Sequence, residues 1–215
     1  MAENFRTLIA RNAESFSFLY QETIDRLASL GPVDFFNPED FNYQLSARPI
    51  GTLSELSGER IVNYQLLYLP GGYPEKHLEA LVKNEACRLA IKDFAERGGR
   101  IIAECGGMMY LCQSIVTDDG EYPMCGVFPY KITACKADRK LSLGYRKFTL
   151  DGREYRGHEF HYTQFLGEVP PSIVQVYNAK GEAVATPVLR YKNVLASYTH
   201  LYDFYCQSGT PLPLG

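Results

Sequence analysis

Three features that would assign a class at once are missing from the sequence: a basic surplus, a long apolar run and an export signal. The chain has 22 Lys and Arg against 25 Asp and Glu, a net charge of -3, which gives no electrostatic basis for binding nucleic acid. No stretch approaches the roughly 20 apolar residues that span a bilayer, and residues 1–7 lack the charged-then-apolar pattern of a signal peptide. We therefore expect a cytoplasmic protein that binds neither nucleic acid nor a membrane.

The signatures of a disulfide framework and of a structural zinc site are also missing. None of the six cysteines forms a CxxC pair or has the Cys/His spacing of a zinc ligand set, and a cytoplasmic chain keeps its thiols reduced. We expect no bound metal, and we expect most of these residues to be small buried hydrophobes. The cysteines are Cys87, Cys105, Cys112, Cys125, Cys135 and Cys206.

The composition is that of an ordinary globular protein. Apolar residues make up 46% and charged residues 22% of the 215 positions, which is enough for one sizeable core. No linker rich in Pro, Gly or Ser and no repeat divides the chain. We therefore expect a single domain over residues 1–215.

Strand and helix patterns alternate in the first half of the chain. Such alternation predicts a parallel sheet covered by helices on both faces. Short apolar runs predict the strands, apolar residues at helical spacing predict the helices, and one long segment without clear periodicity predicts a surface excursion. The expected strands are 7–10, 33–36, 66–69 and 100–103, the expected helices are 16–30, 74–97 with a break near Asn84, and 108–116, and the excursion is 37–60.

The second half changes character. Its segments are short, aromatic and punctuated by glycine, which predicts antiparallel strands that extend or flank the parallel core. The fold class is therefore α/β. The expected strands of this half are 127–132, 146–150, 155–162, 173–177, 183–189 and 194–198.

The turn around Cys105 carries the strongest chemical signal. An apolar strand ends, Cys105 follows, and Gly106 and Gly107 precede an apolar helix, which is the cysteine form of a nucleophile elbow. The helix N-terminus is expected to lower the thiol pKa, and the N–H of Gly106 would be available to a developing oxyanion. An ordinary buried cysteine in a glycine-rich turn is the alternative.

A second glycine loop, residues 70–75, follows another apolar strand. In a parallel sheet it would lie at the same edge as Cys105, where Gly71 or Gly72 could supply a second oxyanion donor. The alternative is a tight turn in which Pro74 begins a helix. Phosphate binding is the weaker option, because the loop lacks the Lys and Ser/Thr of a P-loop.

A cysteine nucleophile needs a base within hydrogen-bond reach, usually a histidine. The chain has four: His77, His158, His161 and His200. His77 is expected at an exposed helix start. His200 follows the expected strand 194–198, and side chains at strand ends converge on one edge, so His200 is the best-placed candidate.

Together these segments resemble the glutaminase domain of cobyrinic acid a,c-diamide synthase, within the class I glutamine amidotransferases. The resemblance spans nearly the whole chain in the family's order and implies a three-layer, flavodoxin-like fold with a mostly parallel central sheet and extra antiparallel strands in the second half. The matching pieces are residues 10–11, 16–18, 69–75, 103–111, 143–145, 156–162 and 196–200.

The resemblance also implies roles. Cys105 would form a γ-glutamyl thioester with L-glutamine and release ammonia, and His200 would activate the water that hydrolyses it. Gly72 and Gly106 would donate to the oxyanion.

Three further residues, Arg156, His158 and Glu159, would line the glutamine side of the cleft or the synthase interface. In the family, ammonia passes to a synthase domain that uses ATP and Mg²⁺ to amidate the a and c acetate side chains of a corrin ring.

The sequence departs from that pattern in three ways, one of which is the segment 37–60, which looks longer than the family usually has there. It contains no ATP-binding half, so we expect no cofactor in this chain and expect ATP and Mg²⁺ in a separate synthase domain or subunit. Many class I amidotransferases carry a Glu two residues beyond the base, where this chain has Tyr202. Asp203, Glu159 or a partner residue could orient His200 instead. A homodimer is left open.

Three other interpretations stay open. Another cysteine hydrolase or lyase of similar layout could act on a different small molecule. A regulatory module could retain a vestigial elbow with an unlowered thiol pKa. His158, Glu159 and His161 could bind a metal, although in a strand the two histidines point to opposite faces.

Overall fold

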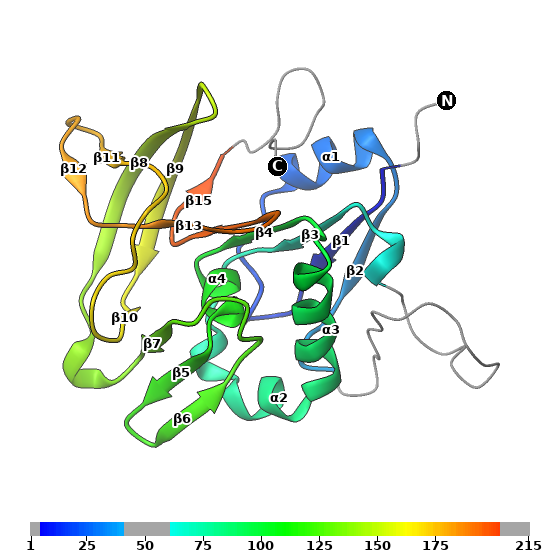
Figure 1. Cartoon of the computed structure of the whole chain (residues 1–215), viewed down its shortest axis with the longest axis horizontal. Coiled ribbons are helices and arrows are strands. Elements are labelled where there is room, and N and C mark those ends of the chain that lie inside the picture. The colour runs from blue at the N-terminus through cyan, green and yellow to red at the C-terminus, as the bar shows by residue number, and fades with distance from the viewer. Residues whose placement is uncertain (1–4, 41–60, 203–215) are drawn as a thin grey trace.

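A six-stranded sheet lies at the centre of the computed structural model, which describes residues 5–40 and 61–202 (Figure 1). The strand order is β13-β14-β4-β3-β1-β2. All neighbours pair in parallel except β13 with β14, so the expected mostly parallel sheet is confirmed. The strands are β1 (Thr7–Ala10), β2 (Val33–Phe36), β3 (Leu66–Leu69), β4 (Ile101–Glu104), β13 (Val188–Tyr191) and β14 (Val194–Ser197).

Strand alternation divides the apolar residues of this sheet between two cores. Leu67 and Leu69 of β3 point to one core, and Leu66 and Tyr68 point to the other, because successive side chains of a strand face opposite ways. The first core is completed by α2 (Leu78–Lys83), α3 (Glu85–Glu96) and α4 (Gly106–Leu111), and the second receives α1 (Gln21–Leu30).

The second face of the sheet is not covered by helices alone, which corrects the expectation from the first half of the chain. Beside α1, residues of an antiparallel sheet such as Phe148 and Tyr155 pack against it. This five-stranded sheet has the order β12-β11-β8-β9-β15 and lies beside the central sheet in Figure 1. Its strands are β8 (Ser142–Leu150), β9 (Arg153–His161), β11 (Val176–Asn178), β12 (Ala183–Val184) and β15 (His200–Leu201).

A small four-stranded sheet, order β10-β7-β5-β6, lies below α4 in the same view. Three 3-10 helices complete the described secondary structure, and none of the helices in the described residues has the length and apolar composition that crossing a bilayer requires. The strands are β5 (Ser114–Thr117), β6 (Gly120–Pro123), β7 (Lys131–Thr133) and β10 (Gln164–Phe165), and the 3-10 helices are Ile61–Asn63, Pro74–Lys76 and Lys136–Asp138.

Two predicted helices have wrong boundaries, for tertiary reasons. The helix expected at 16–30 begins at Gln21, because Phe18 forms a β-bridge with Gly71. The helix expected at 108–116 begins at Gly106 and ends at Leu111, and its last residues belong to β5, which pairs with β6 and β7.

Other boundaries differ less. The break near Asn84 is confirmed, since its side chain caps α3 by accepting from the N–H of Cys87. Of the strand expected at 127–132 only the end is extended, in β7, and the strand expected at 183–189 divides into β12 and β13. Most of the expected excursion, residues 41–60, lies outside the described residues.

Candidate active site

Cys105 is the single residue between β4 and α4 and forms the turn that joins them. Its φ of 46° and ψ of -108° fall in a sparsely populated region for a residue with a side chain. The N–H of Cys105 donates to the carbonyl of Ser197 on β14 at 2.8 Å, which holds the turn against the sheet. The expected elbow therefore lies at the carboxyl edge of the parallel strands, and its backbone is strained.

Close backbone packing requires glycine at both positions that follow Cys105. A Cβ on Gly107 would lie 2.0 Å from the carbonyl oxygen of Leu69. A Cβ on Gly106 would lie 2.7 Å from the carbonyl oxygen of Gly72 and 3.0 Å from its nitrogen. The elbow and the glycine loop after β3 thus lie backbone against backbone.

In the described residues, the backbone N–H of Gly72 in that loop is left available as a hydrogen-bond donor. A Cβ here would lie 2.2 Å from the carbonyl oxygen of Ser15, so the chain passes where no side chain fits. The preceding carbonyl, of Gly71, accepts from the N–H of Phe18 at 3.0 Å. Within residues 5–40 and 61–202, the N–H of Gly72 has no acceptor, which leaves an amide beside the elbow able to bind an anion.

His200 reaches the same edge from β15. Its backbone pairs with β9, opposite His158, and a Cβ on Gly71 would lie 2.2 Å from Cε1 of the imidazole. The glycine loop therefore contacts both the elbow, through Gly72 and Gly106, and the imidazole. Residues distant in sequence, 71–72, 105–106 and 200, meet at one edge of the sheet.

Aromatic rings enclose the imidazole of His200. The ring of His158 stacks on it with centroids 5.0 Å apart and an interplanar angle of 15°, and Phe18 lies 5.5 Å away on a tilted plane. Tyr202 stacks on the ring of His158 at 5.7 Å. The side chain two residues beyond His200 thus belongs to an aromatic stack.

The protonation states follow from burial. Burial raises the pKa of the Cys105 thiol well above its ordinary value, the charge of Glu75 adds to this, and the N–H of Gly106 opposes it. The expected lowering of this pKa is therefore wrong, because burial outweighs the six-residue helix α4. Burial, with the charges of His158 and His161, lowers the pKa of His200 to about 4. At neutral pH the pair is a thiol and a neutral imidazole.

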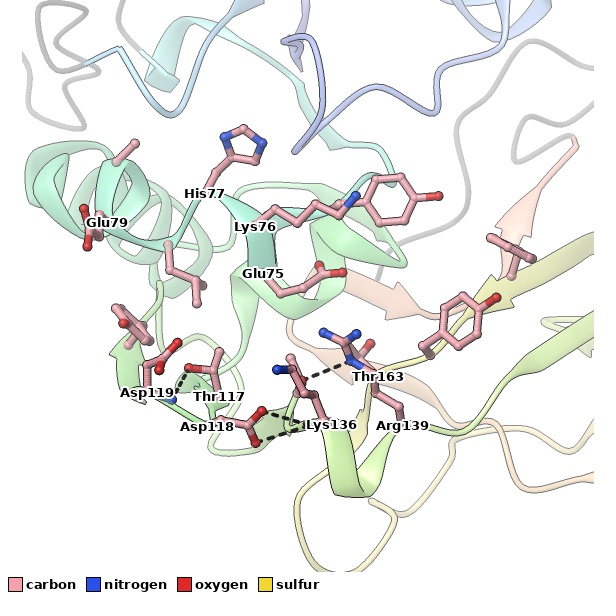
Figure 2. Close-up of a pocket in the computed structure, with 17 residues that line it drawn as sticks. Glu75, Lys76, His77, Glu79, Thr117, Asp118, Asp119, Lys136, Arg139 and Thr163 are labelled. Atoms are coloured by element: carbon pink, nitrogen blue, oxygen red, sulfur yellow. Dashed lines mark hydrogen bonds between the residues drawn. The ribbon is translucent and has the colours of Figure 1, made fainter.

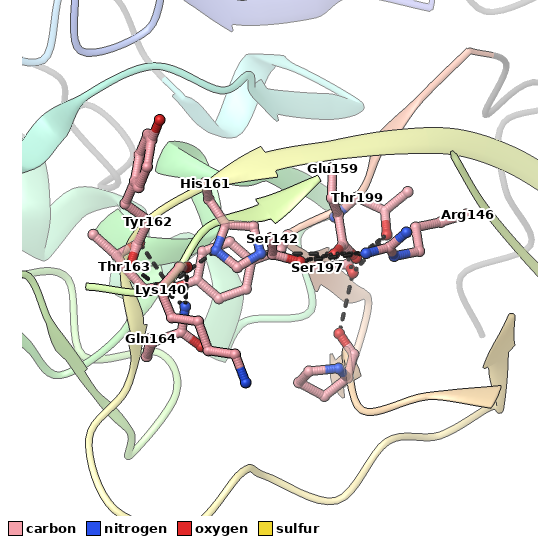
Figure 3. Close-up of polar contacts among 12 residues, drawn as sticks. Lys140, Ser142, Arg146, Glu159, His161, Tyr162, Thr163, Gln164, Ser197 and Thr199 are labelled. Atoms are coloured by element: carbon pink, nitrogen blue, oxygen red, sulfur yellow. Dashed lines mark hydrogen bonds and ion pairs between the residues drawn. The ribbon is translucent and has the colours of Figure 1, made fainter. Parts of the chain in front are cut away.

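Two buried glutamates flank the segment that carries the base. The sequence suggested Glu159 as a possible orienter of His200 but did not single out Glu104. Glu104 accepts from the N–H of Leu201 at 3.1 Å and from the hydroxyl of Tyr68 at 2.8 Å. Glu159 accepts from the hydroxyl of Thr199 at 3.2 Å (Figure 3). A signal for Glu104 existed in the sequence, since it is the charged last residue of an apolar strand directly before the nucleophile.

The residues expected to line the glutamine cleft or the synthase interface lie in different surroundings. Arg156 is exposed on β9 and pairs with Glu154. His158 stacks on His200 and its Nδ1 lies 3.3 Å from the hydroxyl of Tyr20. Glu159 has no exposed surface, so it is bonded within the protein and not open to substrate. Asp203, the other candidate orienter, lies outside the described residues.

A cavity of about 860 Å³ opens beside the glycine loop. Glu75 lines one side, and Lys136 and Arg139 come from the segment after β7 (Figure 2). Tyr73 also lines the cavity. Glu75 and Arg139 face the same space, and Glu75 is close enough for its charge to raise the pKa of Cys105. Neither Cys105 nor His200 lines this cavity; Tyr73 and Glu75 connect it to the glycine loop, to which they belong, and the lining carries side chains of both signs.

The alternative metal site is not supported in the described part of the chain, where no group of three metal-ligating side chains is present. His161 stacks on Tyr198 at 3.7 Å, whereas His158 stacks on His200. The two rings thus occupy different aromatic stacks, as expected for positions on opposite faces of β9.

The sequence of this chain is similar to those of known proteins. Residues 30–204 match the CobB/CobQ-like glutamine amidotransferase domain. The chain is 34% identical over 199 residues to a cobyrinate a,c-diamide synthase of Sulfurisphaera tokodaii, an alignment that covers 87% of this chain and 40% of that protein. It is 35% identical over 207 residues to a hydrogenobyrinate a,c-diamide synthase of Rhizobium meliloti, with 93% and 44% covered. The chain spans less than half the length of these curated relatives.

Solved structures share the fold. A glutamine amidotransferase from Thermotoga maritima superposes with a TM-score of 0.52 and 17% identity over 92% of this chain and 76% of that one. PurLQS from the same organism gives 0.52 and 14% over 92% and 88%. The expected three-layer α/β class is confirmed.

Proposed function

The chain belongs to the CobB/CobQ-like glutamine amidotransferase domain family, and we propose that within it Cys105 is the nucleophile and His200 the general base for hydrolysis of L-glutamine. One observation carries this assignment of roles. The glycine loop contacts both Gly106, next to the strained Cys105, and the imidazole of His200. Nucleophile, base and backbone amides therefore share one site.

The resting protonation states are the ones from which general-base catalysis starts, although the raised pKa of the Cys105 thiol and the lowered pKa of His200 make the proton transfer itself uphill. The thiol of Cys105 is neutral at rest, and His200, with a pKa of about 4, is a neutral imidazole free to accept its proton. The sulfur would attack the side-chain carbonyl carbon of glutamine as the proton passes to His200. The imidazolium would then return that proton to the departing ammonia, leaving a γ-glutamyl thioester on Cys105.

Hydrolysis of the thioester would use the same base, with His200 first accepting a proton and then returning it. His200 would take a proton from water as the water oxygen attacks the thioester carbon. The carbon–sulfur bond would then break, glutamate would leave, and the proton would return to the sulfur of Cys105. One base thus serves both halves of the reaction.

The backbone N–H groups of Gly72 and Gly106 are our proposed oxyanion donors. The Gly72 N–H has no acceptor in the described residues, and the Gly106 N–H is directed toward the sulfur of Cys105. Losing one such donor costs about 100-fold to 1,000-fold in kcat. Because neither glycine has a side chain, these two amides lie closer together than a Cβ at Gly106 would allow.

The cavity beside the glycine loop suits the amino-acid end of glutamine, which carries a carboxylate and an ammonium. Arg139 and Lys136 offer positive charge to the carboxylate, and Glu75 offers negative charge to the ammonium. Arg156 is exposed on β9, so of its two expected roles we favour the synthase interface.

The ammonia acceptor is inferred from the relatives. We propose that ammonia passes to a synthase domain or subunit, which uses ATP and Mg²⁺ to amidate the a and c carboxylates of cobyrinate or hydrogenobyrinate. The curated relatives bear those names and are more than twice as long as this chain. A cytoplasmic location fits the five described cysteines, all of which are free thiols.

Replacement of Cys105 tests the assignment of roles. Cys105→Ala should abolish glutamine hydrolysis and leave the fold intact, as judged by circular dichroism. The matched control is Cys112→Ala, which removes another buried thiol and should retain activity. Glutamine hydrolysis by Cys105→Ala at the unaltered rate would overturn the proposal.

A further inference from the structure

His200 lies between two residues that are each hydrogen-bonded to the side chain of a buried glutamate. The hydroxyl of Thr199 donates to Oε1 of Glu159 at 3.2 Å, and the N–H of Leu201 donates to Oε1 of Glu104 at 3.1 Å. Neither glutamate has more than 2% of its surface exposed. The backbone on both sides of the imidazole is therefore fixed by groups that solvent does not screen.

The two oxygens of Glu159 have separate partners. Oε2 accepts from the hydroxyl of Ser142 at 2.9 Å and lies 3.1 Å from Nη2 of Arg146. Oε1 is thereby left to Thr199, as Figure 3 shows. Burial raises the pKa of Glu159, but contacts with His161, Thr186 and Arg146 outweigh it and hold the pKa below its ordinary value, so the carboxylate is charged.

Close backbone packing keeps this segment against β9. A Cβ on Gly157 would lie 2.0 Å from the carbonyl oxygen of His200. The hydroxyl of Thr199 also lies 3.4 Å from that of Ser197, which donates to the carbonyl of Pro187. The Thr199 hydroxyl thus links β14, which ends beside the elbow, to the charged pair on β8 and β9.

The side chain two residues beyond His200 cannot orient the imidazole as a carboxylate would. That side chain is Tyr202, and its ring stacks on His158. We infer that Glu159, held by Arg146 and Ser142, is the positioning residue for His200 and acts through the hydroxyl of Thr199. This inference rests on the proposed function of His200 as the base.

Substitution at Thr199 separates positioning from mere stability. Thr199→Val keeps the shape and removes the hydroxyl, whereas Thr199→Ser keeps the hydroxyl. A base held out of line slows the chemical step, so Thr199→Val should lower the kcat of glutamine hydrolysis about tenfold or more and leave KM within about twofold of the unaltered protein. Thr199→Ser should retain kcat within about twofold.

The control is a bond of the same kind in another sheet. Ser114 is buried and donates to the exposed carboxylate of Glu121 at 2.7 Å, so Ser114→Ala also removes a bond from a buried hydroxyl to a carboxylate and should leave kcat unchanged. If Thr199→Val does not fold, Thr199→Ala replaces it in the comparison with Thr199→Ser.

Equal kcat in Thr199→Val and Thr199→Ser would overturn the inference, as would a loss in Thr199→Val that appears in KM alone. Both results leave the proposed function standing, because the unaltered chain still hydrolyses glutamine through Cys105. Absence of hydrolysis by the unaltered chain and by its complex with the synthase would instead overturn the proposed function, and this inference with it.

Discussion

The imidazole of His200 lies directly against the backbone of Gly71, so that a Cβ at Gly71 would come within 2.2 Å of Cε1. A contact of this kind cannot accommodate a methyl group unless something moves. The glycine loop and the base are therefore positioned by each other, and the first prediction concerns this contact.

Gly71→Ala should displace the imidazole while leaving the thiol of Cys105 in place. We expect kcat for glutamine hydrolysis to fall about 100-fold, since a displacement of about 1 Å at a reacting group costs that much. Steady-state kinetics measure this. Thermal unfolding serves as the control, because a general loss of structure would lower the melting temperature along with the rate. Unchanged kcat in a folded Gly71→Ala protein would contradict the placement of His200.

The pH dependence of activity should reflect the low pKa of His200. Because burial lowers that pKa to about 4, the imidazole is neutral and able to act as a base down to about pH 5. The acid limb of the profile of kcat/KM should therefore have its midpoint near pH 4, more than one unit below the ordinary value for histidine. A midpoint near pH 6.5 would contradict the buried, neutral base.

The neighbouring ring of His158 provides a second test of the same pKa. The charge of His158 is the cause of the lowered pKa of His200 that ranks after burial. His158→Phe keeps an aromatic ring in the stack and removes that charge, so the acid limb should move toward higher pH. A shift toward lower pH, or none, would show that the two rings do not interact electrostatically.

Glu104 should make stability depend on pH in an unusual direction. Burial raises its pKa to about 8, so between about pH 4.5 and pH 8 the folded protein holds a proton that the unfolded chain releases. The free energy of unfolding therefore falls as the pH rises through that window, by at most about 5 kcal/mol. Glu104→Gln cannot titrate and should gain stability relative to the unaltered protein across the same window.

Urea unfolding at about pH 5 and about pH 8.5 measures the difference. Glu121 is the control with the opposite sign, because hydrogen bonds from Ser114 and Lys131 lower its pKa. Its contribution is present above the ordinary pKa and is lost as the pH falls, so Glu121→Gln should lose stability near neutral pH. A gap between Glu104→Gln and the unaltered protein that stays constant with pH would contradict the raised pKa.

The elbow and the parallel sheet could be predicted because their signals are local. Three apolar residues, Ile101 to Ala103, and the Cys-Gly-Gly turn that follows Glu104 identify strand, nucleophile and helix start within a short stretch of sequence. The break at Asn84 was equally local, since one side chain caps the next helix. His200 could be placed because a strand precedes it.

The features that could not be predicted depend on contacts distant in sequence. The start of α1 is set by the pairing of Phe18 with Gly71, and β5 by its neighbours β6 and β7. The raised pKa of Cys105 follows from burial, which no neighbouring residue reveals. The position of Glu159 inside the protein depends on Arg146 across the hairpin of β8 and β9.

The most direct test of the account is covalent trapping at Cys105. The protein, with its synthase partner where one is available, is exposed to a diazo-ketone analogue of glutamine and the labelled peptide is identified by mass spectrometry. We predict a single adduct on Cys105, prevented by excess L-glutamine, lost in Cys105→Ser, and retained in Cys112→Ala. An adduct on another cysteine, or a Cys105 that stays unlabelled while the partner is bound, would contradict it.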